Sequence, residues 1–210
     1  MKQVSYRLAE AMERICKRKS LEAITVSEIA AEAGVTRQVF YHYFNDKFEL
    51  AAWIHYVHLY QSVKQALEEK SEQMWRATTL HWLQRLEKNR ELYANAFQSA
   101  SQKEFQRNIR DFFNKSYQWQ LERYLKRTLS EEEKFALRSY CIGSIELICE
   151  WVSRDNRVSS ERMMELLELS MPEVLRQKAL ALETVPFAEA VEIMEEYLLQ
   201  AGLSQTIGQE

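Results

Sequence analysis

The sequence predicts an all-α protein, and three observations lead to this prediction. The chain of 210 residues contains four Gly and two Pro, so few residues interrupt helix formation. Apolar residues recur every three or four positions along most segments, as they do on one face of a helix. Thr25 and Ser130 each precede a Glu by three positions, which is the capping-box pattern of a helix start. We therefore expect packed helices with a core large enough for one or two domains.

Residues 25–47 predict two short helices with a tight turn between them. Thr25 caps the first helix, and Gly34 lies where a helix end favours the left-handed conformation. Thr36 caps the second helix. The first helix has a narrow apolar face made of Val26, Ile29, Ala30 and Ala33. The pattern indicates a helix-turn-helix motif, and in such motifs the second helix enters the major groove of DNA.

The segment from Ile24 to Leu50 resembles the DNA-binding segment of the TetR family of transcriptional regulators. The matching features are Ile29-Ala30, Ala33-Gly34-Val35-Thr36, Tyr41, Phe44, Lys47 and Leu50. The rest of the chain is similar to the family in its length and its helical character. The resemblance implies a three-helix DNA-binding head over residues 1–48, joined by a long helix to a helical ligand-binding and dimerisation domain over residues 49–210.

Residue chemistry and the resemblance together predict which side chains contact DNA. Arg37 suits guanine O6 and N7, and Gln38 suits adenine N6 and N7. Val39 stands where the family often has a small hydroxyl residue, so it offers only an apolar contact, for example with a thymine methyl group. By motif position, the expected phosphate contacts are Ser27, Thr36, Tyr41, Tyr43 and Lys47. Tyr43 replaces a histidine that is common in the family.

The rest of the chain predicts further helices. No Gly or Pro interrupts residues 46–70, so this segment should form a rod that joins the head to the remaining chain. Pro172 is expected to kink or restart a helix, because proline cannot continue one. The expected helices cover residues 3–19, 46–70, 71–88, 90–100, 103–127, 130–154, a segment that begins at Ser159 or Ser160, and 186–201.

Aromatic residues are dense between residues 71 and 127, and two interpretations of them remain open. The resemblance implies that this region encloses a cavity for a small molecule, where the polar tips of Tyr and Trp side chains orient the ligand. The alternative is that these side chains form a plain core. The candidate ligand-binding residues are Tyr93, Phe97, Phe113, Tyr117, Trp119 and Tyr140.

The segment over residues 130–154 is apolar around much of its circumference, so we expect this helix to be buried. The resemblance implies that it and the following helix pair with their copies across a two-fold axis, which makes a homodimer. Packing inside a single chain is the alternative. The candidate dimer residues are Ile142, Gly143, Ile145, Cys149, Val152, Met163, Leu167, Met171 and Leu175.

Residues 140–172 carry a second resemblance, to a subgroup that includes regulators of dihydroxyacetone kinase operons. It depends on Gly143, Trp151 and the Met171-Pro172 pair. Some members of that subgroup respond to a partner protein instead of a small molecule. Two interpretations of the protein as a regulator therefore remain open. In the first it is a homodimeric repressor that a small-molecule effector releases from a pseudo-palindromic operator. In the second it is a regulator or activator controlled by a partner protein. A third possibility is a helical interaction protein whose head no longer reads DNA.

The sequence argues against several other classes of function. It contains no nucleophile elbow, phosphate-cradling glycine loop or cluster of metal ligands, so we expect no enzyme, no cofactor and no metal. His55 and His58 lie three apart, but no Cys or acidic partner stands out to complete a site. Three Cys residues favour reduced thiols in the cytoplasm, and no apolar run is long enough to span a membrane. The net charge of −3 still permits a local basic patch for DNA.

Overall fold

The computed structural model describes residues 4–71, 74–98, 102–154 and 158–182, and every regular element in these ranges is an α-helix, which confirms the all-α prediction. The helices are α1 (Val4–Cys16), α2 (Val26–Glu32), α3 (Arg37–Tyr43), α4 (Lys47–Glu68), α5 (Met74–Lys88), α6 (Arg90–Gln98), α7 (Gln102–Leu125), α8 (Glu131–Ser153), α9 (Ser160–Ser170) and α10 (Glu173–Leu182). The helix expected over residues 186–201 lies outside the described ranges. Within them, no helix combines the length and the hydropathy that crossing a bilayer requires.

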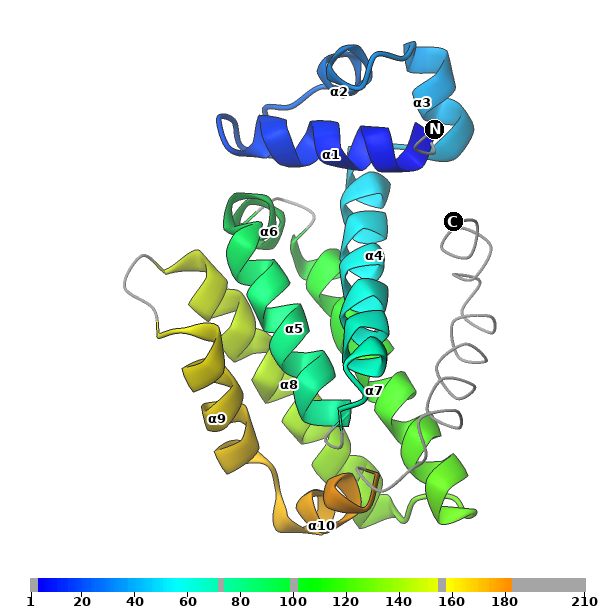
Figure 1. Ribbon diagram of the computed structural model, residues 1–210, viewed down its shortest axis with the longest axis vertical. Helices are drawn as coiled ribbons and strands as arrows, with labels where there is room; N and C mark the ends of the chain where they lie inside the picture. Colours follow the sequence, from blue (N-terminus) through cyan, green and yellow to red (C-terminus); the bar gives the residue numbers. More distant parts are fainter. Residues whose placement is uncertain (1–3, 72–73, 99–101, 155–157, 183–210) are drawn as a thin grey trace.

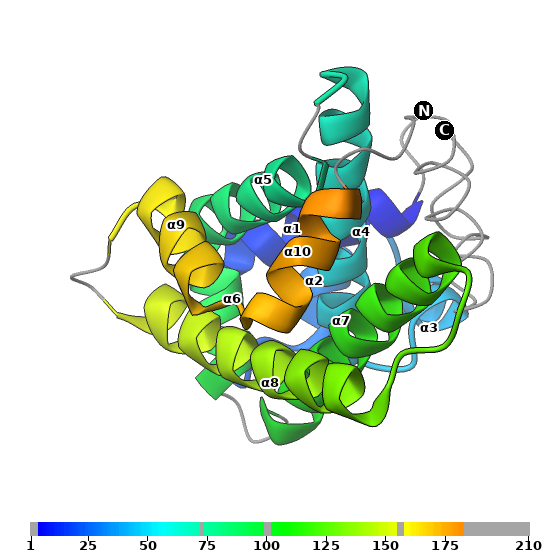
Figure 2. The same cartoon turned by 90° about the horizontal axis from the view of Figure 1, so that it is seen from below.

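Helices α1–α3 form a head above a body that contains α5–α10 (Figure 1). α1 lies across the upper end of α4, and α2 and α3 lie on the side of α1 that faces away from the body (Figure 1). α4 runs from the head into the body, where it packs along α5. Seen from below, α8 runs beside α7 along one edge of the body, α9 lies beside α5, and α10 crosses the end (Figure 2). The helix-turn-helix therefore lies at one end of the molecule, with α4 as its connection to the rest.

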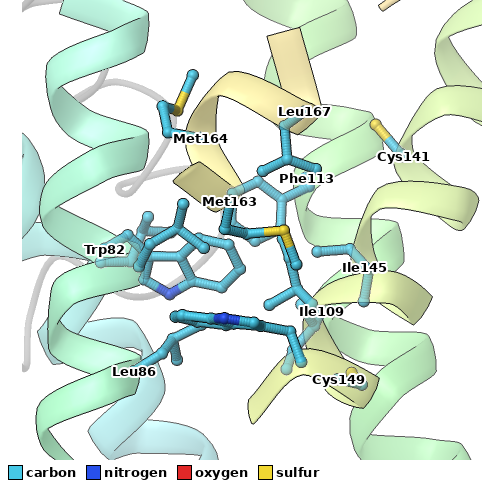
Figure 3. Close-up of a cluster of buried hydrophobic side chains, with 14 of the residues drawn as sticks. Trp82, Leu86, Ile109, Phe113, Cys141, Ile145, Cys149, Met163, Met164 and Leu167 are labelled. Carbon is cyan, nitrogen blue, oxygen red and sulfur yellow. The ribbon is translucent and has the colours of Figure 1, made fainter. Parts of the chain in front are cut away.

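Two clusters of buried apolar side chains hold the fold together. In the body, Trp82 of α5, Phe113 of α7 and Met163 of α9 lie close together, beside buried side chains of α8 (Figure 3). The rings of Trp82 and Phe113 have centroids 4.8 Å apart. The second cluster fills the head and also includes Leu92 and Ala96 of α6. Because the head shares its core with a body helix, it is packed onto the body and not merely tethered to it.

A buried carboxylate fixes the start of α8. The Ser130–Glu133 capping box forms as expected, with the backbone N–H of Ser130 donating to Glu133 Oε2 at 2.8 Å. Arg127 donates to both carboxylate oxygens at 2.8 Å, and Lys178 Nζ of α10 lies 3.1 Å from Oε1. The hydrogen bonds from Arg127, followed by the one from Ser130, hold the pKa of Glu133 well below its usual range. The ion pair between Glu133 and Lys178 therefore anchors α10 against the start of α8.

The three cysteines are free thiols in the interior. Cys141 and Cys149 lie on α8, and Cys16 ends α1; all three are buried. Burial raises the pKa of Cys16 and of Cys141 to about 12. Thiols with such values stay protonated near neutral pH, so they behave as small apolar core residues.

Candidate nucleic-acid interface

Local hydrogen bonds fix the start of α2. The backbone N–H of Glu28 donates to Thr25 Oγ1 at 3.2 Å, and the backbone N–H of Thr25 donates to Glu28 Oε2 at 2.9 Å. This is the capping box expected from the sequence. The hydrogen bond from Lys19, together with those from Thr25, lowers the pKa of Glu28 to about 2. The carboxylate that caps α2 therefore stays ionised under all ordinary conditions.

The turn between α2 and α3 has the geometry that a glycine-ended helix favours. Gly34 has a φ of +67°, in the left-handed region that L side chains rarely adopt. Its N–H donates to the carbonyl of Ala31 at 3.0 Å, and the N–H of Val35 donates to the carbonyl of Ala30 at 2.9 Å. These two bonds form a Schellman motif, which satisfies carbonyls at the end of α2. The direction in which α3 leaves the turn is thereby set.

Arg7 of α1 braces the same turn from the other side, a contact that sequence reasoning missed. Its Nη2 donates to the carbonyl of Ala33 at 2.6 Å and to the carbonyl of Gly34 at 3.0 Å. A Cβ atom on Gly34 would lie 3.1 Å from the same Nη2. No local pattern signals this contact, because Arg7 is separated from the turn by more than twenty positions.

Helix α3 presents its first turn to solvent. The hydroxyl of Thr36 accepts the backbone N–H of Val39 at 3.3 Å, so the cap expected at this position is formed. Phe40 is fully buried in the head core, which directs the opposite side of α3 outward. Arg37 and Gln38 are both exposed there. The two side chains expected to read bases are thus held on a rigid helix with their polar ends in solvent.

Arg37 lies beside Tyr41 on the outer face of α3. Arg37 Nη2 is 3.5 Å from the Tyr41 phenol oxygen, and the guanidinium carbon is 5.9 Å from the ring centroid. A contact this long is weak, so it orients the guanidinium without consuming its remaining donors. Tyr41 is 49% exposed, and its neighbour Tyr43 is 40% exposed. Both phenols are therefore accessible for a contact with phosphate.

The other expected contact positions divide by exposure. Ser27 on α2 and Thr36 before α3 are exposed. Val39 is half-buried, so only part of its side chain faces solvent. The hydroxyl groups of Ser27 and Thr36 are thus open to solvent, as a contact with phosphate requires.

Lys47 makes hydrogen bonds within the protein that its sequence position did not reveal. Its Nζ donates to the carbonyl of Glu22 at 2.7 Å and to the carbonyl of Ile24 at 2.8 Å. An ammonium group has three N–H donors, so one is left for a phosphate. The side chain ties the first turn of α4 to the loop before α2, and any contact with DNA would be added to this structural role.

The cations at the end of α1 are partly engaged within the head. Arg14 Nε lies 2.7 Å from Glu32 Oε1 of α2, and Lys19 pairs with Glu28. These pairs span α1 and α2 and neutralise part of the positive charge near the motif. Lys17 and Arg18 are exposed.

The candidate ligand-binding residues lie in the body, where several form a packed core. Tyr93, Phe97 and Phe113 are buried, and the Tyr93 phenol is hydrogen-bonded to His58 of α4. Tyr117, Trp119 and Tyr140 are half-buried.

Two of these phenols place polar groups inside the body. Burial is the main cause that raises the pKa of Tyr117 to about 12, while hydrogen bonds with Thr79 and Trp75 act in the opposite direction. Tyr140 donates to the carbonyl of Leu167 at 3.0 Å, which joins α8 to α9. Both phenols therefore stay neutral and can act as hydrogen-bond donors in an apolar setting.

The candidate dimer residues divide into two groups. Ile142 is 44% exposed, and Gly143 has no atom of another segment within 4 Å of an added Cβ. The remaining seven lie in the core of the body, where their own chain covers them; these are Ile145, Cys149, Val152, Met163, Leu167, Met171 and Leu175. No pattern in the sequence indicates which apolar side of α8 or α9 faces inward.

Other apolar side chains, which the sequence did not single out, are exposed on the same helices. Phe135 is 74% exposed and Leu147 is 52% exposed, and both lie on α8. On α9, Leu166 is 40% exposed and Leu169 is 69% exposed. At helical spacing, Phe135 and Ile142 share one side of α8, and Leu147 lies farther round the helix.

The His, Cys, Asp and Glu side chains do not gather into a metal site in the part of the chain that the structure describes. No group of three or more of them there could hold a metal ion.

Two family models match this chain. Residues 8–53 match the model described as bacterial regulatory proteins, tetR family. Residues 73–172 match the model described as transcriptional regulator C-terminal region. The two matches together cover more than half of the chain, and they include both the candidate interface and the exposed faces of α8 and α9.

Solved structures with similar folds include two regulators. The dihydroxyacetone kinase operon activator DhaS is 23% identical, with a TM-score of 0.53 over 80% of this chain and 96% of that chain. A tetR-family transcriptional regulator from Streptomyces coelicolor is 14% identical, with a TM-score of 0.47 over 98% of this chain and 97% of that chain. The comparison with curated proteins finds no match.

Proposed function

This chain belongs to the TetR family of DNA-binding transcriptional regulators, and we propose that it acts as a homodimeric repressor that a small-molecule effector releases from a pseudo-palindromic operator. In this proposal residues 1–48 read DNA, and residues 49–210 bind the effector and dimerise. The protein works in the cytoplasm without catalytic activity, cofactor or metal.

The observation that carries the proposal is the exposed first turn of α3. Arg37 and Gln38 project from a helix whose start, turn and buried side are all fixed by hydrogen bonds or core packing. A rigid helix of this kind fits the major groove, where bidentate contacts from Arg and Gln distinguish bases. Ser27, Thr36 and Tyr41, with Tyr43 and Lys47, supply phosphate contacts that hold the helix in register.

A homodimer is proposed because one head offers few base contacts and because α8 has exposed apolar side chains. Phe135, Ile142 and Leu147 are exposed along this helix, and Gly143 leaves room for close approach by another helix. Exposed apolar patches of this kind mark protein interfaces. The proposed interface therefore keeps Ile142 and Gly143 and replaces the buried candidates with Phe135, Leu147, Leu166 and Leu169.

The effector is proposed to bind among the half-buried aromatic residues of the body. The Tyr117 phenol there is a polar group within an apolar surrounding, and the Tyr140 phenol, whose O–H already donates to Leu167, can still accept a hydrogen bond from a ligand. A ligand that binds one arrangement of these helices better than another shifts the population of head positions, and α4 carries the shift to the head. Effector binding would favour a separation of the two heads that does not fit the operator.

A second candidate is control by a partner protein. The exposed apolar residues of α8 and α9 favour it, because they could serve a foreign helix as well as a second copy. Under this alternative the aromatic residues of the body are plain core, and the protein could activate transcription instead of repressing it.

Site selection from a random DNA library by the purified protein tests the proposal. We expect enrichment of an inverted repeat whose half-sites lie about one helical turn or a small multiple apart. Release of that repeat by the small-molecule fraction of a cell extract supports effector control, whereas release only by the protein fraction favours the second candidate. Failure to enrich any repeat contradicts the proposed dimeric reader.

A further inference from the structure

A chain of hydrogen bonds crosses the junction between the head and the body. His58 Nδ1 of α4 lies 2.8 Å from the phenol oxygen of Tyr93 on α6. His58 Nε2 lies 3.1 Å from Glu13 Oε1 on α1. Tyr93 is 1% exposed and His58 is 8% exposed, so water has little access to either group. A head helix, the connecting helix and a body helix therefore meet through three polar side chains.

The chemistry of the three groups assigns a donor and an acceptor to each contact. Burial first, and the charge of Glu13 second, raise the pKa of Tyr93 well above its usual value, so the phenol keeps its proton. In the tautomer that carries its hydrogen on Nε2, His58 accepts a hydrogen bond from the Tyr93 O–H at Nδ1 and donates its Nε2–H to the Glu13 carboxylate. The chain runs in one direction from α6 to α1, and a break at either contact leaves a buried group without its partner.

Apolar side chains of α1 and α6 pack beside this chain of hydrogen bonds. Leu92 and Ala96 of α6 pack in the same cluster as Leu8 and Met12 of α1. Apolar packing is non-directional, whereas a hydrogen bond weakens steeply when its length or angle departs from a narrow range. The polar chain therefore restricts how far α1 can turn or slide on α6 and α4.

The same short helix α6 is also bonded to the helix that carries the proposed dimer face. Arg90, at the start of α6, donates from Nε to the carbonyl of Val152 on α8 at 3.0 Å. One turn later, Tyr93 enters the core of the body and ends at His58. Directional bonds therefore lead from α8 through α6 to α1.

We propose that Glu13, His58 and Tyr93 are positioning residues that set the angle of the reading head on the body, and thereby the half-site spacing that the dimer accepts. The inference rests on the proposed function in its second part, because spacing matters only to a dimeric reader. None of the three residues contacts DNA in this proposal. They act through the placement of α3.

The first test compares binding to a series of inverted repeats whose spacers differ by single base pairs. In Tyr93→Phe and Glu13→Leu, we expect the ratio between the affinity for the best spacer and for its neighbours to fall about tenfold, the factor that one lost hydrogen bond is worth. Glu13→Gln should restore part of the ratio, because its amide oxygen still accepts from His58. Tyr56→Phe, which removes another partly buried phenol of α4, should leave the ratio unchanged. An unchanged ratio in Tyr93→Phe and Glu13→Leu overturns the proposal.

The second test measures the head directly and does not need DNA. Spin labels at Ala31→Cys on α2 and Lys88→Cys on α5 report the distance between head and body, since both positions are exposed and the three native cysteines are buried. Tyr93→Phe and Glu13→Leu should broaden the distance distribution, while Tyr56→Phe should match the parent protein. Equal widths overturn the proposal even if the variants lose stability. If the unmodified protein selects no inverted repeat, the proposed function fails. The widths of the distance distributions between the spin labels then decide by themselves whether these residues fix the position of the head.

Discussion

In the head, α2 and α3 bury their apolar side chains and expose polar ones, whereas α8 and α9 carry apolar side chains on both their inner and outer sides. The exposed large hydrophobic side chains of α3 are those of Tyr41 and Tyr43, which end in hydroxyl groups. On α8, the exposed Phe135 and Leu147 have no polar group to meet water. The comparison teaches that the two regions are built for different partners. The head suits a charged and hydrated surface, and α8 suits another apolar helix.

The largest expected effect comes from a charge on the exposed side of α8. Ile142→Glu should convert the proposed dimer to a monomer and weaken operator binding about 100-fold or more, because the second head would then bind as a separate molecule. Sedimentation and operator titration measure both effects. Lys115→Glu, which places the same charge at an exposed position of α7, should change neither. A dimeric Ile142→Glu variant with normal affinity would remove α8 from the interface.

The stability of the protein should decrease in acid because of His55, which is buried on α4, the helix that joins the head to the body. Complete burial, with the nearby charge of His58 as a smaller cause, lowers the pKa of His55 from 6.5 to about 3. Below pH 6.5, His55 is protonated in the unfolded chain but stays neutral in the folded chain. The free energy of unfolding should therefore fall by up to about 1.4 kcal/mol for each pH unit below 6.5, until the pH approaches the folded-state pKa.

Denaturant titrations at several pH values measure this dependence. In His55→Leu, which cannot titrate, the fall between pH 6.5 and acid should be shallower than in the unmodified protein. Parallel curves for the two proteins would show that His55 is protonated as easily in the folded as in the unfolded chain.

Base reading by α3 can be separated from general attraction to DNA. Arg37→Ala should cost about 1–3 kcal/mol on the preferred operator and leave binding to random DNA nearly unchanged, because base contacts are lost while phosphate contacts remain. Lys17→Ala removes another exposed cation of the head and should not alter sequence preference. Equal losses on both DNAs for Arg37→Ala would exclude this side chain as a base reader.

The two glycines should respond in opposite ways to the same added methyl group. Gly34→Ala places a side chain at a φ of +67°, and the strain should cost about 1–2 kcal/mol of unfolding free energy. Gly143→Ala, made in the monomeric Ile142→Glu background, should stabilise by about 0.5–1 kcal/mol, because the site is helical and open. Chemical denaturation gives both values, and similar signs would contradict this interpretation of the turn.

The smallest expected effect distinguishes the two roles of Lys47. Lys47→Met should lower the unfolding free energy by about 1 kcal/mol, because the carbonyls of Glu22 and Ile24 lose a charged donor. If the third N–H also meets phosphate, the slope of log affinity against log salt should decrease by about one. A lower stability with an unchanged slope would leave Lys47 a structural residue only.

The sequence by itself determined the two helices of the helix-turn-helix motif and the turn between them. Thr25, Gly34 and Thr36 act on backbone groups only a few residues away, so their roles follow from local spacing and are found in the structure as hydrogen bonds and a positive φ. The same holds for Ser130 at the start of α8 and for Pro172 before α10. Helix starts and turns are short-range features, and short-range patterns predict them.

Only the tertiary structure decided which apolar side of α8 and α9 faces the chain's own core. Ile145 and Met163 were expected at a dimer interface, yet they lie in the core of the body, while Phe135 and Leu169 are exposed. A helix that is apolar on both sides has no periodicity that distinguishes core from interface. The hydrogen bonds of Arg7, Lys47 and His58 could not be predicted from the sequence either. Each joins groups far apart in the chain, and only packing brings such partners within hydrogen-bonding distance.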